Sequence, residues 1–455
     1  MREATEVDAY RDNGNGMEKK LYEKVAALPV IDFHCHLSPR EIYEDKPFSD
    51  IGELWLAADH YKWRLMRTAG VSEKFITGDA SYKEKYLKFT EVVSTALGNP
   101  IREWAAMELS RYFNIGLKIC PQYAERIWEE ANAKIVGGRL SPRKLIEWSN
   151  VEYIATTDDI SDDLRYHNLL KDYKVKITPT FRTDKLFLID DLCEYNAYIK
   201  KLGDIENIQI NNLNDLKDVL KHRLYHFVVN GCSFSDIGAE GFPSVIFDDN
   251  HAEEIFGGLL RGKEISAAEK DGFFGNLYFY LGCLYAENNI VQQWHLAAAR
   301  NCNDKRFAEI GPDGGYDCVG DIIDIRRIRN MLNALNNVGR LPTTIIYALN
   351  PAMNYPLTTL CGAFENVRTG ISWWFNDHKR GLRDTFSTVS ELQHITSLAG
   401  MVTDSRSFLS YVRHDYFRRI LCGFLAENAT ESDFAYALET AEKLCYKNAR
   451  ALIGE

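Results

Sequence analysis

Two histidines one residue apart, His34 and His36, are the side chains whose types and spacing suggest chemistry most clearly. They end an apolar run over residues 28–36, which we expect to form a strand. Alternate residues of a strand face the same way, so both imidazoles should point into one site while Phe33 and Cys35 face the helices. Imidazole nitrogens are common ligands of Zn²⁺. The spacing therefore indicates a divalent metal site, and the alternative is a pair of surface or packing histidines.

The residues that follow indicate where this strand ends. Ser38 is a favoured N-cap, Pro39 suits the first helical position, and Glu41 would complete a capping box. A helix that begins here leaves the two imidazoles at the carboxyl end of the strand, which is where a barrel enzyme places its chemistry.

Asp404 is the second candidate, at the end of an expected strand over residues 400–404. An aspartate at that edge can complete a metal site or act as a general base. The alternative is a helix N-cap, because aspartate is favoured there and residues 407–425 carry apolar side chains at helical spacing. An adjacent strand with His34 and His36 would favour the metal site. The sequence leaves open whether Asp404 is a ligand, a base or both.

Several other polar and aromatic side chains stand near the ends of expected strands or on an inserted helix or loop. They are Arg182 after the third strand, Asp236 after the fourth, His295 and Arg300 after the fifth, Trp373 after the seventh, and the inserted Tyr61 and Arg64. Arginines suit carboxylate recognition through paired hydrogen bonds, and an indole suits the apolar face of a sugar ring. Taken alone, such residues more often have a structural role, as a surface side chain, a salt-bridge partner or a core tryptophan, and His295 fits a buried structural histidine equally well.

The elements that would position these residues alternate between strand and helix. Eight strands are expected, over residues 28–36, 152–157, 175–181, 226–232, 290–295, 343–349, 368–373 and 400–404. Eight such units predict an α/β fold, specifically a closed (β/α)₈ barrel of the TIM type. An open doubly wound sheet is the rival architecture, but no Gly-x-Gly-x-x-Gly sequence opens a helix to support it.

Uneven spacing between the strands predicts two helical insertions. Residues 40–150 contain no convincing strand and include helical patterns over 101–113 and 123–133, so we expect a helical insertion after the first strand. A smaller helical insertion is expected after the fourth strand, near residues 238–289. The expected division is an N-terminal segment with the first strand (1–39), the helical insertion (40–150) and the remainder of the barrel (151–455).

Composition narrows the class of protein. The 455 residues are 45% hydrophobic and 26% charged, which is typical of a globular protein and not of a disordered chain. The net charge of −11 and the lack of a long basic run argue against nucleic acid binding. The ten cysteines form no Cys-x-x-Cys pair, so we expect a reducing cytoplasm. We expect neither a signal peptide nor a membrane span, because no apolar run approaches roughly 20 residues.

Read together, these segments resemble the uronate isomerase (glucuronate isomerase) family of the amidohydrolase superfamily. The matching segments are DFHCHLSP (32–39), DHYKWRLMR (59–67), TTDD (156–159), PTFR (179–182), QWHLAAAR (293–300), GPDGGYD (311–317), SWWFND (372–377) and MVTDSRSF (401–408). They occur in family order and span nearly the whole chain. The ordered set is far more specific than any one segment.

The resemblance implies conversion of D-glucuronate to D-fructuronate and of D-galacturonate to D-tagaturonate, on a barrel that holds a divalent metal, with zinc the first choice. Carried over position by position, it makes His34, His36 and Asp404 the metal-site residues. Catalysis would fall to Asp404 as the base, with Tyr61 or Arg406 stabilising an enediolate. Substrate binding would fall to Arg182, Arg406, His295, Arg300, Trp373, Asp236 and Arg64. We further expect a small sugar acid as the binding partner and a homo-oligomeric assembly.

One position departs from the family pattern, which usually has Ser-Asp-His-Gly after the fourth strand. Here the sequence is Ser235-Asp236-Ile237-Gly238, and Ile237 can neither donate a hydrogen bond nor shuttle a proton. The departure keeps open the alternative of a non-catalytic sugar-acid binding protein. A metal-dependent hydrolase of the amidohydrolase superfamily, on the same barrel, is the other alternative.

Overall fold

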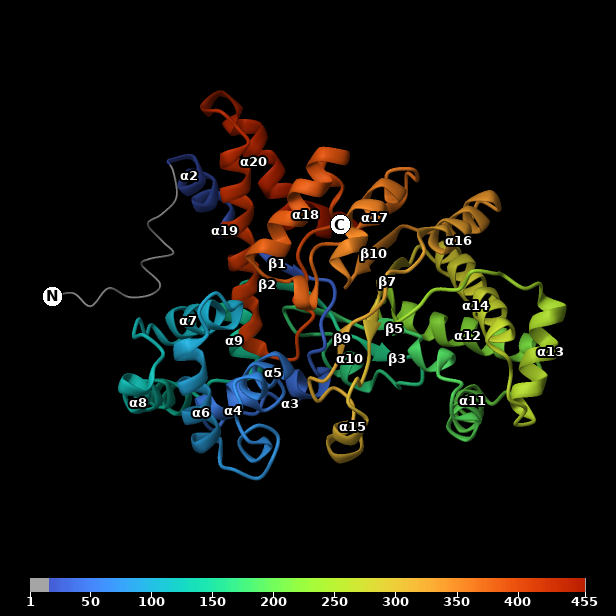
Figure 1. Ribbon diagram of the computed structural model, residues 1–455, viewed down its shortest axis with the longest axis horizontal. Coiled ribbons are helices and arrows are strands. Elements are labelled where there is room, and N and C mark those ends of the chain that lie inside the picture. The colour runs from blue at the N-terminus through green and yellow to red at the C-terminus, as the bar shows by residue number, and fades with distance from the viewer. Residues whose placement is uncertain (1–15, 455) are drawn as a thin grey trace.

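The computed structural model describes residues 16–454, and its parallel strands lie between two groups of helices (Figure 1). Residues 1–15 of the expected N-terminal segment lie outside the described residues, as does Glu455. Within 16–454, none of the helices is both long enough and apolar enough to cross a membrane.

All strands of the barrel are parallel and fall into two sheets. The first has the order β1–β2–β4, and comprises β1 (Val30–Asp32), β2 (Val151–Ala155) and β4 (Lys176–Thr178). The second has the order β11–β10–β7–β6–β5–β3, and comprises β3 (Asp158–Asp159), β5 (Thr180–Arg182), β6 (Phe234–Ala239), β7 (Val291–Leu296), β10 (Thr344–Ala348) and β11 (Val367–Thr369). The two sheets are continuous along the chain, because β3 follows β2 and β5 follows β4 across Pro179.

The expected eighth strand, over residues 400–404, runs beside β1 without forming a regular ladder. The backbone N–H of Asp404 donates to the carbonyl of His34 (3.1 Å), and the N–H of His36 donates to the carbonyl of Ser405 (3.0 Å). The N–H of Thr403 instead donates to the carboxylate of Asp32 (2.9 Å), which replaces a ladder bond. The (β/α)₈ class is confirmed, with the last segment of the barrel lying against its first strand.

The expected fourth strand over residues 226–232 is wrong. Residues 226–229 are the last turn of α12 (Leu213–Val229), which buries Leu216, Leu220, Leu224 and Phe227 at helical spacing. The helix is followed by Gly231 at φ 89°, and the strand starts only at Phe234. We expected Asp236 to follow the fourth strand, but it lies within β6.

Helices alone connect β1 to β2 and form one of the two helical groups. They are α3 (Pro39–Glu44), α4 (Ile51–Leu56), α5 (His60–Thr68), α6 (Tyr82–Thr95), α7 (Pro100–Phe113), α8 (Pro121–Gly138) and α9 (Pro142–Trp148). Two helices follow β6, namely α13 (Asp249–Leu260) and α14 (Ala267–Glu287). Helices α4 to α8 and helices α13 and α14 lie at opposite ends of the long axis of the molecule (Figure 1). The helical insertions after strands one and four are thus present.

The remaining helices cover the barrel or its ends. They are α2 (Gly16–Val25), α10 (Arg165–Leu169), α11 (Leu192–Glu206), α15 (Asp304–Ile310), α16 (Ile325–Asn337), α17 (Asn354–Cys361), α18 (Lys379–Leu392), α19 (Val412–Glu427), α20 (Phe434–Glu442) and α21 (Asn448–Leu452). A short antiparallel pair, β8 (Ala298–Ala299) and β9 (Cys318–Val319), holds the loop after β7. The helix expected over 407–425 forms as a 3₁₀ turn, η6 (Phe408–Tyr411), followed by α19.

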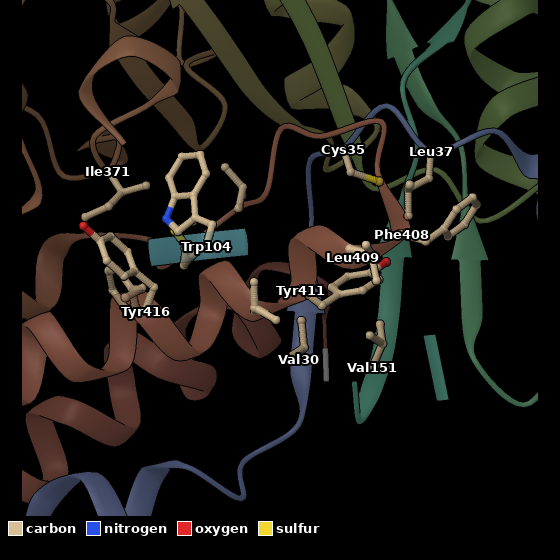
Figure 2. Close-up of a cluster of buried hydrophobic side chains, with 14 of the residues drawn as sticks. Val30, Cys35, Leu37, Trp104, Val151, Ile371, Phe408, Leu409, Tyr411 and Tyr416 are labelled. Carbon is tan, nitrogen blue, oxygen red and sulfur yellow. The ribbon is translucent and has the colours of Figure 1, made fainter. Parts of the chain in front are cut away.

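A buried apolar cluster packs the residues next to His34 and His36 against the residues that follow Asp404. Cys35 and Leu37 lie beside Phe408 and Leu409 from η6, and Figure 2 shows these side chains together. Each large apolar side chain that is fully buried contributes roughly 1.5–3 kcal/mol. The cluster therefore holds the end of β1 against the segment that carries Asp404.

Phe33 does not face the helices, contrary to the alternation that we expected. Its ring stacks on Phe234 of β6, with ring centroids 5.6 Å apart, and Phe234 also meets Tyr153 of β2. Strands β1 and β6 are not neighbours, so this contact crosses the barrel interior. The reason is that β1 ends at Asp32, beyond which the chain bends and strict alternation no longer applies.

Candidate active site

His34, His36 and Asp404 meet where β1 and the last barrel segment end. Oδ1 of Asp404 lies 3.2 Å from Nε2 of His34 and 3.0 Å from Nε2 of His36. One ligand atom from each residue lies within 4.8 Å of the others. The predicted convergence of these three residues is therefore present in the structure.

Asp404 is not a helix N-cap, which was the alternative reading. The cap of η6 is Ser407, whose hydroxyl accepts from the backbone N–H of Leu409. Asp404 has φ 44°, in the left-handed region, which turns its carboxylate toward the histidines. Its second oxygen accepts a hydrogen bond from the indole N–H of Trp373 (2.5 Å).

The charge states of Asp404 and His36 suit metal binding. Burial alone would raise the pKa of Asp404, but hydrogen bonds from His34 and His36 hold it well below its usual range. Burial lowers the pKa of His36 to about 4, so this imidazole is neutral at pH 7. Burial also opposes the charged form of His34, but the neighbouring Asp236 and Asp404 carboxylates raise its pKa overall.

The donor set fits a divalent metal. Two imidazoles and a carboxylate are common zinc ligands, and ligands must offer unprotonated nitrogen and ionised oxygen. Nδ1 of His34 is buried and has no hydrogen-bond partner among residues 16–454. The nitrogens that face Asp404 are the two Nε2 atoms, so these and the Asp404 carboxylate are the ligand atoms that this centre offers.

His295 of β7 extends the centre across the barrel. Its ring stacks on His34 with centroids 4.3 Å apart, and its Nδ1 lies 2.6 Å from Oδ1 of Asp236. A carboxylate at Nδ1 accepts a hydrogen bond from Nδ1–H and leaves Nε2 as the acceptor. Nε2 is buried without a partner in the described chain. Burial and the nearby His34 lower the pKa of His295, so it is neutral and can accept a hydrogen bond.

Two guanidinium groups lie close together on the same side of the cavity. Arg182 contacts Asp236 through Nη1 and Asp184 through Nη2, both at 2.6 Å. A Cβ on Gly238 would lie 3.1 Å from Nη2 of Arg182 and 3.3 Å from Nη2 of Arg300. Glycine thus permits the two cations to approach the same backbone position. Such paired arginines suit an anionic ligand.

The loop after β7 holds further charged groups at the rim. Arg406 contacts Asp313 at 2.8 Å, and Arg300 contacts Asp317 at 3.1 Å. The guanidinium of Arg64 donates to the carbonyl oxygen of Asp317 (2.7 Å). Arg64 therefore supports this loop.

A cavity of about 840 Å³ contains most of the expected site residues. Its lining includes His34, His36, Arg182, His295, Arg300, Trp373, Asp404 and Arg406. Asp236 lies behind the lining, against His295 and Arg182. Tyr61 and Arg64 line a neighbouring cavity of about 240 Å³, which shares His60 and Trp374 with the first.

The sequence reasoning missed several residues that line the main cavity. His60 precedes Tyr61 in a matching segment, and Asp313 and Asp317 belong to the GPDGGYD segment, to which no chemistry had been assigned. Trp374 packs against the guanidinium of Arg300, whose central carbon lies 4.9 Å from the ring centroid of Trp374. Matching segments were thus the available signal for most of these residues.

Ile237 is buried in an apolar cluster with Trp294 of β7 and Ile346 of β10, and it also belongs to the lining of the main cavity. Asp236, one residue earlier, faces His295 inside the barrel. Ile237 therefore gives the cavity an apolar surface at the position where the family pattern has a histidine.

Comparisons with known proteins agree with this geometry. The sequence matches the glucuronate isomerase family over residues 8–453. A uronate isomerase of Clostridium perfringens is 40% identical over 448 residues, which cover 95% of this chain and 96% of the relative. A crystal structure of uronate isomerase from Thermotoga maritima has 34% identity and a TM-score of 0.92, and covers 96% of this chain and 97% of that one. A glucuronate isomerase from Caulobacter crescentus shares the fold at 24% identity and a TM-score of 0.90, covering 96% and 94%.

Proposed function

The chain belongs to the glucuronate isomerase family, and from that premise we propose how its own residues perform uronate isomerisation. The enzyme interconverts D-glucuronate and D-fructuronate, and D-galacturonate and D-tagaturonate. The reaction moves a proton from carbon 2 to carbon 1 of the open-chain sugar, while the hydroxyl proton of oxygen 2 passes to oxygen 1. It therefore needs a base beside both carbons and a group that stabilises the enediolate between the two transfers.

Asp404 is the proposed base. The observation that carries the proposal is its position, because a buried carboxylate with a lowered pKa faces the cavity at the barrel end. An ionised carboxylate can take the proton from carbon 2 and return it to carbon 1. Tyr61 or Arg406 would stabilise the negative charge on the enediolate oxygen. Arg406 lines the main cavity, whereas Tyr61 lies in the adjoining cavity beside His60.

His34, His36 and Asp404 would hold the divalent metal, with zinc as the first choice for this set of nitrogen and oxygen ligands. When bound, such a metal supplies Lewis-acid polarisation of a sugar oxygen. The two Nε2 atoms that face Asp404 and the low pKa of His36 support this assignment.

The carboxylate of the substrate would bind on the arginine side of the cavity. Arg182 and Arg300 both reach the position of Gly238, and Arg406 stands at the rim. The indole of Trp373 would wall the sugar ring, and Nε2 of His295 would accept from a sugar hydroxyl. Asp236 would orient His295 and Arg182, and Arg64 would support the loop that carries Asp317.

Three wider expectations belong to the same proposal. A small sugar acid is the binding partner, and the enzyme acts in the cytoplasm as a homo-oligomer. All ten cysteines are free thiols, which suits a reducing compartment.

The test of the function is proton NMR of the purified, metal-loaded protein with D-glucuronate and, separately, with D-galacturonate. We expect ketose signals to grow with both sugars. D-glucose, which lacks the carboxylate, is the matched control and should give no ketose. Absence of conversion of both uronates would refute the proposal.

A further inference from the structure

A buried ion pair lies behind the proposed catalytic residues. Arg413 of α19 donates through Nε to Oδ2 of Asp377 (2.8 Å), and its Nη2 donates to the same oxygen. Both side chains are almost fully buried, at 3% and 1% exposure. A charge pair removed from water is costly unless its geometry is good, so its placement next to a site calls for a functional explanation.

The cation of Arg413 also lies against two aromatic rings. Its guanidinium carbon is 5.3 Å from the ring centroid of Tyr61 and 4.6 Å from that of Trp104. Trp104 meets Tyr416, one turn along α19, edge to face at 6.1 Å, and Figure 2 shows these two rings together. A planar guanidinium against an aromatic face fixes the ring's orientation as well as contributing attraction.

The same pair also fixes the turn that carries Trp373. Asp377 immediately follows the 3₁₀ turn η4 (Trp374–Asn376), and Trp373 precedes that turn. The indole of Trp373 donates to Asp404. Arg413 thus ties α19 to both the ring of Tyr61 on α5 and the segment that hydrogen-bonds Asp404.

We infer that Arg413, held by Asp377, is a positioning residue for the isomerase reaction and acts through Tyr61. This rests on the proposed function and takes Tyr61, one of the two residues named there, as the group that stabilises the enediolate. The cation fixes the orientation of the Tyr61 ring. Burial raises the pKa of the Tyr61 hydroxyl well above its usual value, and the positive charge of Arg413 opposes that rise. Arg413 thereby makes the hydroxyl a stronger hydrogen-bond donor to a developing oxyanion than burial alone would leave it.

The experiment compares Arg413→Met with Arg418→Met. Arg418 lies on the same helix and is equally buried, but it donates to the carbonyls of Ala26, Leu28 and Pro29, away from Tyr61. We expect Arg413→Met to lower kcat by about tenfold to a hundredfold with KM nearly unchanged. We expect Arg418→Met to keep kcat even if it lowers the Tm. Equal losses of kcat in both variants would overturn the inference.

A double-mutant cycle with Tyr61→Phe separates this inference from the proposed function. If Arg413 acts through Tyr61, Arg413→Met adds no further loss of kcat in the Tyr61→Phe background. If the losses of kcat in the two single variants multiply in the double variant, the inference is overturned, although the isomerase activity stands. A Tyr61→Phe variant with unchanged kcat also overturns the inference. Failure of the wild-type protein to convert either uronate refutes the function itself.

Should Arg413→Met fail to fold, Arg413→Lys carries the same cycle. Lysine keeps the charge but loses the planar fork and the ring stack. We expect a smaller loss of kcat than in Arg413→Met, again absent in the Tyr61→Phe background. Full wild-type kcat in Arg413→Lys would overturn a role that depends on the guanidinium plane.

Discussion

At the scale of single residues, Asp404 connects three parts of the site. One carboxylate oxygen faces His34 and His36, and the other accepts from Trp373. Its left-handed backbone costs a non-glycine residue about 1–2 kcal/mol. The hydrogen bonds to its carboxylate offset that cost and fix the oxygen positions. A residue held this way is rigid in the geometry that its chemistry needs.

Replacing Asp404 with asparagine should remove the base while preserving the shape of the side chain. We expect the rate of uronate conversion to fall by about 10²–10⁴-fold, because a neutral amide cannot take the proton from carbon 2. Initial rates by NMR measure this, together with the Tm. Asp415→Asn, which alters an ion pair with Arg419 on α19, is the control. A variant that keeps more than a tenth of the wild-type rate would exclude Asp404 as the base.

Gly238 allows a second test at the residue scale. An alanine Cβ would lie 3.1 Å and 3.3 Å from the terminal nitrogens of Arg182 and Arg300 and push the two cations apart. We expect Gly238→Ala to raise KM for the uronate about tenfold and to change kcat little. Gly241→Ala is a matched control, because a Cβ there meets nothing within 4 Å. An unchanged KM in Gly238→Ala would argue against a carboxylate site between these arginines.

At the scale of elements, the sequence predicted strands best where apolar runs were short and bounded by turn or helix signals. Seven of the expected strand regions contain a strand or an extended barrel segment, including the run that ends at His36. The run over 226–232 failed because Val228 and Val229 favour strands locally, whereas burial of Leu220, Leu224 and Phe227 on one face decides for the helix. Propensity over seven residues cannot detect a helical stripe that began at Leu213.

The sequence predicted the part of the candidate site that lies at the ends of strands and missed the part that lies elsewhere. Residues at strand ends, such as His34, Asp404 and Arg182, were found because parallel strands bring their carboxyl ends together. His60 and Asp313 were missed, since each lies outside the strand ends and reaches the cavity through tertiary packing. Nothing in local spacing reports which insertion folds over the barrel mouth.

Strand β3 and helix α10 share a buried pair whose pH dependence is predictable. The hydroxyl of Thr156 lies 2.8 Å from both Oδ2 of Asp158 and Nε2 of His167. Burial raises the pKa of Asp158 to about 7 and lowers that of His167 to about 4. Between pH 4 and 6.5 the folded pair holds one proton, on Asp158. The unfolded pair also holds one, on His167, so the pH dependences of the two contributions to stability cancel.

Single variants should reveal opposite dependences of the free energy of unfolding on pH. In Asp158→Asn only the lowered pKa of His167 remains, so the free energy of unfolding, relative to wild type, should rise from pH 4.5 to 6.5. In His167→Asn only the raised pKa of Asp158 remains, so the free energy of unfolding, relative to wild type, should fall over the same range. Each slope is at most about 1.4 kcal/mol per pH unit. Urea unfolding at three pH values measures both, and slopes of the same sign would contradict the account.

At the scale of the whole molecule, the proposed metal site joins the first and last strand regions of the barrel. His34 and His36 are separated from Asp404 by nearly the whole barrel sequence. The same two ends meet again where Tyr22 of α2 donates to Asp415 of α19 (2.5 Å). A metal held by all three ligands therefore binds only the folded chain and should stabilise it.

Metal binding should raise the Tm of the metal-free protein. At a free zinc concentration about a hundred times the Kd, the expected stabilisation is about 2.7 kcal/mol. Calorimetry with and without zinc measures it, and His36→Gln should lose most of the effect. His251→Gln, at an exposed position on α13, should retain it. Equal stabilisation of both variants would place the metal elsewhere.

The most direct test of the central claim is a crystal structure of the Asp404→Asn protein with D-glucuronate and zinc, with anomalous data at the zinc edge. One zinc peak is expected at His34 and His36, where the amide oxygen at position 404 takes the place of the carboxylate as the third ligand. The account also predicts the sugar carboxylate between Arg182 and Arg300, and carbons 1 and 2 beside position 404. A uronate bound outside the 840 Å³ cavity, or with carbons 1 and 2 turned away from position 404, would contradict it.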